Sequence, residues 1–281
     1  MRTTSALTTG AAVIGVLLSS GVALAQPAST GDAGIDPVDT QTAQGLRFTL
    51  GAGAGVAPDY EGSDDYELVP LWNLRVANLY HPQTFIQVFG PRLRSNFLPS
   101  DHWRLGLAGQ FIKERDDVEN DQVDDLEKVD PSVMLGAIAG YDFLADPQQD
   151  LVLELDARQD VANDNGFLAT LRGVYGSRLT ERWRFDAAVG STWASEDYMS
   201  SYFGVDAADA ARSGLDQFSA DEGFKDVSFG GALTFRLLER LSVSALANYT
   251  RLIDDAEDSP VVDDAGDENQ FFGGALVNYT F

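Results

Sequence analysis

Cysteine is absent from this chain of 281 residues, and no long apolar run follows its first 25 residues. The absence of thiols excludes a disulfide framework and thiolate chemistry. No later stretch approaches the 18 consecutive apolar residues that a transmembrane helix requires. A membrane β-barrel needs no such run, because its apolar residues alternate with polar ones and are hidden in a hydropathy average.

Basic residues are scarce, since 19 lysines and arginines stand against 44 aspartates and glutamates, which gives a net charge of −25. A field of this sign disfavours nucleic acid and anionic membrane surfaces, so we expect no nucleic-acid partner. The acids are concentrated in two segments, with nine in residues 113–130 and eight in residues 254–268. We interpret both segments as solvated loops. Loose binding of Ca²⁺ or Mg²⁺ is the alternative, although neither segment has EF-hand spacing.

Histidine is nearly absent as well, and both copies, His81 and His102, fall in expected links between strands. A hydrolase would need a nucleophile and a base within hydrogen-bond reach. Ser100 beside His102 is a weak signal for such a pair, and we interpret it as a turn residue. The chain has no histidine or cysteine metal-ligand spacing, no phosphate-binding loop and no dinucleotide fingerprint. We therefore expect no catalytic residues, no metal site and no cofactor.

The first 25 residues have the parts of a secretory signal peptide. Arg2 supplies the positive charge, residues 11–18 form the apolar core, and Ala23-Leu24-Ala25 is an A-x-A cleavage site. The apolar core is too short to span a bilayer. Residues 26–44 are rich in small and polar residues without periodicity and are predicted to be a flexible mature N-terminus. Residues 45–281 are left as the folded domain.

Apolar side chains recur at every second position through this domain, which is the period of a strand with one apolar face. In the first such stretch, Phe48 and Leu50 share a face opposite Arg47 and Thr49. The pattern predicts twelve strands if the weakest stretch is divided at Gly90. The predicted strands are 45–57, 66–77, 83–90, 91–97, 102–113, 131–143, 149–160, 166–178, 181–194, 223–237, 240–253 and 269–281.

The aromatic residues favour an outer-membrane barrel over the alternative, a soluble β-sandwich. The chain ends with Tyr279-Thr280-Phe281, which places the terminal aromatic on the apolar face, as in the closing strand of a bacterial outer-membrane barrel. Aromatics on the apolar faces stand eight to ten residues apart, as Trp183 and Trp193 do. At about 3.3 Å per residue and a tilt of about 40°, this spacing matches an apolar band between two aromatic girdles.

We therefore predict an all-β protein, a transmembrane antiparallel up-and-down β-barrel of about twelve strands, in the outer-membrane lipid of a Gram-negative bacterium. The lengths of the connections predict its orientation, because such barrels have short periplasmic turns and long external loops. The segments predicted to face outside the cell are 114–130, 161–165, 195–222 and 254–268. The segments predicted to face the periplasm are 144–148, 179–180 and 238–239.

The face opposite the apolar one is charged and is predicted to line the lumen. The residues on this face are Arg47, Arg75, Arg92, Arg94, Arg104, Glu154, Asp156, Arg158, Arg172, Arg184 and Asp186. An arginine facing lipid would cost roughly 2–4 kcal/mol near the bilayer midplane, which excludes the reverse assignment. Two interpretations stay open: a selective pore with a cationic wall, and a narrow lumen filled by paired charges.

Short segments spread along the chain carry a further signal. They are Gly51-Ala52-Gly53, Pro58 to Tyr66, Tyr198-Met199, Tyr202 to Val205, Ser213-Gly214-Leu215, Gly223 to Asp226, Tyr249 to Leu252, Asp258 to Val261, Asn269-Gln270 and the terminal Tyr-x-Phe. Together they resemble the MipA/OmpV family of outer-membrane proteins, to which the MltA-interacting protein belongs. The resemblance spans nearly the whole mature chain and is weakest over residues 113–165. It implies an outer-membrane barrel and offers no catalytic residues.

Three functions remain as hypotheses. The family resemblance implies a scaffold that links a murein lytic transglycosylase to a penicillin-binding protein, and it implies those two enzymes as partners. The second hypothesis is a channel for small solutes through an arginine-lined lumen. The third is a surface adhesin that uses loops 195–222 and 254–268. The short predicted periplasmic turns count against the scaffold, because little of the chain would reach the periplasm.

Overall fold

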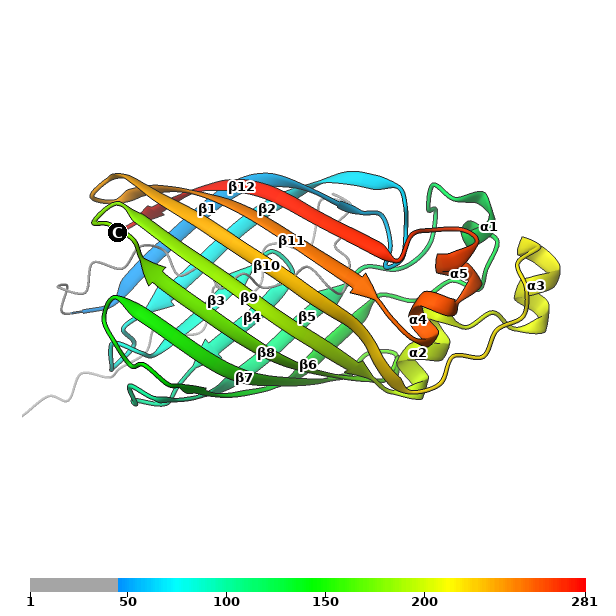
Figure 1. The fold of residues 1–281 in the computed structure, drawn as a ribbon, viewed down its shortest axis with the longest axis horizontal. Coiled ribbons are helices and arrows are strands. Elements are labelled where there is room, and N and C mark those ends of the chain that lie inside the picture. The colour runs from blue at the N-terminus through cyan, green and yellow to red at the C-terminus, as the bar shows by residue number, and fades with distance from the viewer. Residues whose placement is uncertain (1–44) are drawn as a thin grey trace, which may run out of the picture.

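Twelve antiparallel strands form a closed barrel, which confirms the strand number and topology predicted from the sequence. The structure is a computed structural model that describes residues 45–281. Each strand pairs with its neighbours in sequence, and β1 (Arg47–Pro58) closes the ring by pairing with β12 (Asn269–Thr280) (Figure 1). The predicted signal peptide and mature N-terminus, residues 1–44, lie outside the described residues.

The strands begin and end within two residues of the predicted bounds. Those between β1 and β12 are β2 (Tyr66–Ala77), β3 (Phe85–Phe89), β4 (Arg92–Asn96), β5 (Trp103–Ile112), β6 (Ser132–Asp142), β7 (Gln149–Asp160), β8 (Phe167–Arg178), β9 (Trp183–Ala194), β10 (Gly223–Leu238) and β11 (Leu241–Leu252). The division between β3 and β4 falls at Gly90, whose φ of +50° is in the left-handed region that favours glycine. This hairpin is the shortest in the barrel, which explains its weak sequence signal.

The outer wall of the barrel is apolar, as the alternation predicts. Leu68, Trp103 and Phe229 are all more than half exposed, whereas Asn73 and Thr234 are fully buried inside. In water this wall would be a large exposed hydrophobic surface, and a bilayer buries it. The ring closes at the terminus, where the Phe281 N–H donates to the Phe48 carbonyl at 2.8 Å.

The two ends of the barrel differ in shape. The end that carries Phe281, here called the turn end, has the connections 78–84, 97–102, 143–148, 179–182 and 239–240. The opposite end, here called the cap end, has the connections 59–65, 113–131, 161–166, 195–222 and 253–268. The described residues have five helices: α1 (Asp121–Asp124), α2 (Glu196–Phe203), α3 (Ala207–Ser213), α4 (Asp255–Asp258) and α5 (Pro260–Asp263). Figure 1 shows them gathered at the cap end. Every helix within residues 45–281 is too short or too polar to cross a bilayer.

The acidic loops at the cap end are packed, which corrects their interpretation as solvated segments. Val123, Leu126 and Val129 are buried in one loop, and Val261 and Val262 are buried in the other. These side chains join two apolar clusters that hold the loops together, while the acids of residues 113–130 stay outside the buried set. The apolar residues are few among many acids, so neither segment shows a strong hydrophobic period. The cap is therefore a folded layer.

The difference between the ends leads to a test of orientation. Because the chain has no cysteine, a single introduced thiol reports its own side of the membrane without background. We expect Asp121→Cys, an exposed position in α1, to react with a membrane-impermeant maleimide on intact cells. The matched variant Glu239→Cys, exposed at the turn end, should react only after the outer membrane is ruptured. The opposite labelling pattern would reverse the orientation of the barrel.

Candidate functional site

Charged side chains on the inner wall form ion pairs between strands that are not neighbours. Glu154 of β7 is buried and accepts two hydrogen bonds of 2.7 Å from Arg94 of β4. It also accepts a hydrogen bond from Arg172 of β8. Because two strands separate β4 from β7 in the barrel, this contact crosses part of the lumen. The structure thus brings together three residues that the sequence placed on one face.

Two further arginines have acidic partners that the sequence analysis did not include. Arg184 lies 2.8 Å from Asp150 and 2.7 Å from Asp186, and Arg104 donates to Asp142 at 2.9 Å. Asp150 in β7 and Asp142 in β6 both stand at positions that alternation directs into the lumen. Extending the alternation to the last residues of each strand would have found both carboxylates.

The other predicted inward residues make more local contacts. Arg158 Nε donates to Asp156 at 2.8 Å, and its guanidinium also donates to Gln110 on β5. Arg75 donates to Gln87 on the adjacent hairpin at 2.9 Å. Arg75 connects β2 to the neighbouring β3, whereas Arg158 reaches past β6 to Gln110 on β5.

The last two predicted residues lie at different levels of the barrel. Arg92 begins β4 and stands opposite Gln110 in register. Arg47 begins β1 at the turn end, where the charge of Arg75 acts on it.

The inner wall on the other side of the barrel carries an apolar cluster. Val69 and Leu71 of β2 pack with Leu246 of β11 and with Phe272 and Leu276 of β12. These positions share the inward parity of polar residues such as Asn73 and Asn278, which lie hydrogen-bonded at 2.9 Å. The lumen therefore has one side, from β4 to β9, that carries most of the ion pairs. On the other side, from β10 through β12 to β2, an apolar cluster lies among polar residues such as Thr234, Ser244 and Asn278.

Helix α2 fills the mouth of the barrel at the cap end. Its Tyr198 and Phe203 are completely buried. They belong to a cluster that includes inward-facing residues from the cap ends of five strands, namely Ile112, Met134, Leu168, Ala194 and Leu252. Burial of each large side chain stabilises the contact by roughly 1.5–3 kcal/mol. The helix is thus held from most of the circumference of the barrel.

A fully buried ion network lies beneath this helix. Lys225 Nζ, 1% exposed, contacts both Glu61 and Asp226, the latter at 2.7 Å. The Tyr198 hydroxyl donates to the second oxygen of Glu61 at 2.8 Å. Its ring lies 5.8 Å from the Lys225 ammonium. The single ammonium offsets one of the two carboxylate charges, and the Tyr198 hydroxyl supplies a further hydrogen bond to Glu61. These contacts join the first cap loop, α2 and β10 at one point.

Sequence reasoning missed this network because of a β-bulge. Strict alternation places Lys225 on the same face as Val227, which is the lipid side. In the structure the register between β10 and β9 shifts between Phe224 and Asp226, so Lys225 and Asp226 both turn inward. One signal was available. Lys225 is one of only three lysines in the chain, it is next to an acid, and alternation would direct its charge into lipid.

The segments that carry the family resemblance meet at this cap. The Tyr60 hydroxyl donates to the Ala265 carbonyl at 2.9 Å, so it joins two loops. Gln270 Nε2 donates to the Ser63 carbonyl at 3.1 Å. Ser259 Oγ donates to the Phe203 carbonyl at 2.6 Å. Residues separated by up to 207 positions along the chain are therefore joined at one end of the barrel.

A second buried group holds α2 from the side of loop 113–131. The Arg115 guanidinium donates to the Tyr202 carbonyl at 2.8 Å, and its burial lowers the arginine pKa below the usual value. Burial raises the pKa of Tyr202 to about 12, so its phenol stays protonated at physiological pH. The Tyr202 ring stacks on Tyr198 with 4.4 Å between centroids. These contacts tie the acidic loop to the helix that fills the mouth.

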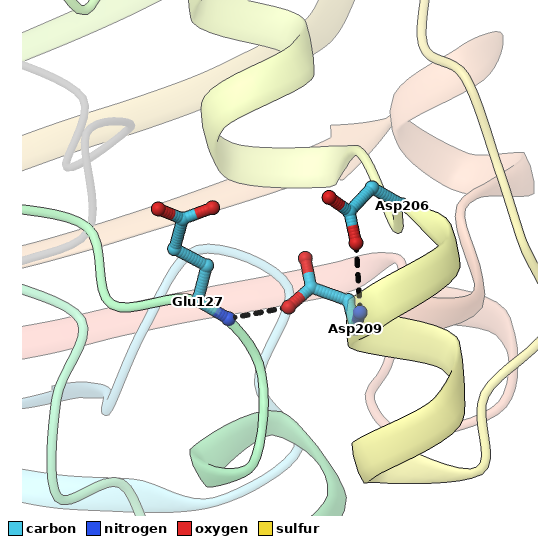
Figure 2. Close-up of side chains that lie close together, drawn as sticks. All are labelled: Glu127, Asp206 and Asp209. Atoms are coloured by element: carbon cyan, nitrogen blue, oxygen red, sulfur yellow. Dashed lines mark hydrogen bonds between the residues drawn. The ribbon is translucent and has the colours of Figure 1, made fainter.

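Three carboxylates at the cap surface approach one another, as Figure 2 shows for Glu127, Asp206 and Asp209. Asp206 caps α3 by accepting from the Asp209 N–H at 2.7 Å. Asp209 accepts from the Glu127 N–H at 2.7 Å and from the Arg212 guanidinium. Their proximity follows from helix capping and from loop packing, so it gives no independent sign of a metal.

The two histidines take part in turns. Thr84 Oγ1 donates to the His81 carbonyl at 2.8 Å, and a ring nitrogen of His102 lies 2.8 Å from the Asp142 carbonyl. Ser100 Oγ accepts from the backbone N–H of His102 at 3.3 Å and of Trp103 at 3.0 Å. These two backbone contacts are the geometry of a turn residue.

Comparison with known proteins identifies the family. A family model described as "MltA-interacting protein MipA" matches residues 50–281. The chain belongs to this family. It is an outer-membrane β-barrel protein, in agreement with the sequence prediction.

Individual relatives differ in how much of the chain they match. The "Putative outer membrane protein YiaT" of Escherichia coli (strain K12) is 25% identical over 227 residues, which covers 79% of this chain and 86% of that protein. The "MltA-interacting protein" of the same strain is 36% identical over 75 residues, or 27% of this chain and 30% of that protein. Among solved structures, the NanC porin covers 83% of this chain and 98% of its own, with 8% identity and a TM-score of 0.46.

The buried network gives a prediction about stability. Lys225→Met leaves two carboxylates in the cap without their ammonium, and breaking a buried pair in this way costs about 3–5 kcal/mol. We expect a lower free energy of unfolding in urea, followed by tryptophan fluorescence in detergent micelles. Adding Glu61→Gln should restore part of the loss, because one uncompensated charge is removed. Arg212→Gln, which removes a half-exposed arginine at the cap surface, should change stability by less than about 1 kcal/mol. Equal stability of Lys225→Met and the parent protein would contradict the role of the network.

Proposed function

We propose that this protein is a non-enzymatic outer-membrane scaffold for peptidoglycan-remodelling enzymes, a murein lytic transglycosylase and a penicillin-binding protein. The observation that carries the proposal is the match of residues 50–281 to a family described by its interaction with such an enzyme. The cap is consistent with it, because α2 and the buried network occupy the mouth that an open conduit would need. The turn end is then the face left for partners in the periplasm.

The turn end offers more surface than the sequence analysis expected. Connections 78–84, 97–102 and 143–148 join consecutive strand pairs, so they form one continuous arc of the rim. Tyr80 is 64% exposed and Phe143 is 56% exposed on this arc. The Tyr80 hydroxyl donates to the Phe97 carbonyl, which ties the first two connections together. An ordered arc with exposed aromatics suits a docking surface better than the two shorter turns, 179–182 and 239–240.

Binding to a partner tests the scaffold directly. We expect the detergent-solubilised barrel to retain a murein lytic transglycosylase from the same organism in a pull-down with purified proteins. Asp101→Lys and Asp146→Lys, both exposed on the arc, should each weaken binding by up to about fivefold, because exposed charge pairs contribute roughly 0.2–1 kcal/mol. Glu239→Lys makes the same charge reversal outside the arc and should leave binding unchanged. Absence of binding by the parent protein would exclude this partner.

A solute channel is the second candidate function, since arginines line one side of the lumen. With α2 in place, we expect small or no conductance in planar bilayers. Tyr198→Ala with Phe203→Ala removes two buried side chains from α2 and should destabilise the plug by roughly 3–5 kcal/mol per residue, giving frequent openings. Any current should prefer anions, because the inner arginines attract them. Glu196→Gln, an exposed change on the same helix, should stay closed. A large cation-selective current in the parent protein would show an open lumen and contradict this assignment of its wall.

A further inference from the structure

Loop 253–268 packs against α2, the helix that fills the mouth of the barrel. It contains α4 and α5, which both lie close to α2 at the cap end (Figure 1). Ala256 is fully buried and Val262 is 1% exposed, and both join the apolar cluster of Tyr198 and Phe203. The loop therefore covers part of α2, and we call it the lid.

The end of the lid that leads into β12 is tightly anchored. The Asp267 N–H donates to the Gly62 carbonyl at 2.8 Å, and the Ala265 carbonyl accepts from the Tyr60 hydroxyl at 2.9 Å. Gly266 lies so close to the neighbouring loop that a Cβ at this position would be 1.9 Å from the Gly62 carbonyl oxygen. This end has no room to move toward loop 59–65, so it is the fixed end of the lid.

The end of the lid that follows β11 contains a strained residue. Asp254 has a φ of +52° and a ψ of −137°. A residue with a Cβ tolerates positive φ mainly when ψ is about +30 to +60°, so this combination favours glycine and costs energy in an aspartate. Asp254 is the N-cap of α4, yet its side chain makes no capping hydrogen bond. The strain is therefore not offset by the contact that an aspartate usually makes at this position.

Contacts on both sides of Asp254 impose its backbone conformation. Before it, the Ile253 N–H donates to the Lys225 carbonyl at 3.0 Å, which ties the chain to β10. After it, the Asp255 carboxylate accepts from the Asp221 N–H at 2.7 Å, and Ala256 is buried against α2. Strained residues persist where the surrounding structure over-determines them in this way. The closed lid therefore stores strain that its opening would release.

We propose that loop 253–268 is a hinged lid that retains α2 in the mouth of the barrel, with Asp254 as the hinge. Opening relaxes Asp254 and withdraws Ala256 and Val262 from α2, while the end at Gly266 stays fixed. The strain lowers the free energy needed for opening, and α2 leaves the mouth only after the lid has opened. This device does not depend on the scaffold function, because the surface proposed for partner enzymes lies at the turn end.

Hydrogen exchange of the folded, detergent-solubilised protein, followed by mass spectrometry, tests the hinge. Asp254→Gly permits the same φ and ψ without strain, so it should stabilise the closed lid. We expect the amides of residues 255–263 to exchange at least threefold more slowly than in the parent protein. Because α2 leaves only after the lid has opened, the amides of residues 196–203 should slow by a similar factor.

A matched variant in the same lid provides the control. Asp258→Gly makes the same substitution at an exposed residue whose backbone is helical. Glycine loses more conformational freedom there, so the amides of the lid should exchange faster. Unchanged or faster exchange of the lid in Asp254→Gly, or slower exchange in both variants, would overturn the hinge. Slower exchange of the lid without any change in α2 would show that the lid does not retain the helix, and this would also overturn the proposal.

Discussion

The requirement that governs this structure is that no backbone N–H or C=O facing lipid can be left without a hydrogen bond. Pairing of β1 with β12 meets it by removing the sheet edges. Closure in turn sends alternate side chains to lipid and to the lumen. The lipid face must be apolar, so charged residues of the strands are confined to the inside. There they need partners, because an isolated buried charge is costly.

The alternation that closure imposes on the strands explains which features could be predicted from the sequence. The lipid face imposes a period of two on every strand, so all twelve strands are visible and their bounds are found within two residues. Even the short hairpin is marked, because Gly90 adopts a φ of +50° at its turn. Alternation assigns a side chain to a face but does not assign its partner. The contact of Arg94 with Glu154 depends on how strands three places apart are staggered, which no local pattern records.

The cap was predicted less well for a different physical reason. Its loops are anchored by a few apolar residues within acidic segments, so composition suggested solvation where Val123 and Val261 are in fact buried. The bulge beside Phe224 turns Lys225 from the lipid face to the lumen. Simple alternation, which assigned faces correctly in the other strands, therefore fails at this residue. The family-like segments gave the better guide, since Glu61, Tyr198 and Lys225 come from three of them.

Shape and charge agree on which end of the barrel can receive a ligand. At the cap end, α2 fills the mouth and the acids of loops 113–131 and 253–268 lie around it, so an anion approaching there meets both a steric and an electrostatic barrier. At the turn end there is an open cavity whose lining includes Arg47 and Arg178, at the ends of β1 and β8. Because the cap closes the other end of the barrel, this cavity opens on one side only. A partner enzyme that docks on this barrel, as we propose, would therefore meet it at the turn end.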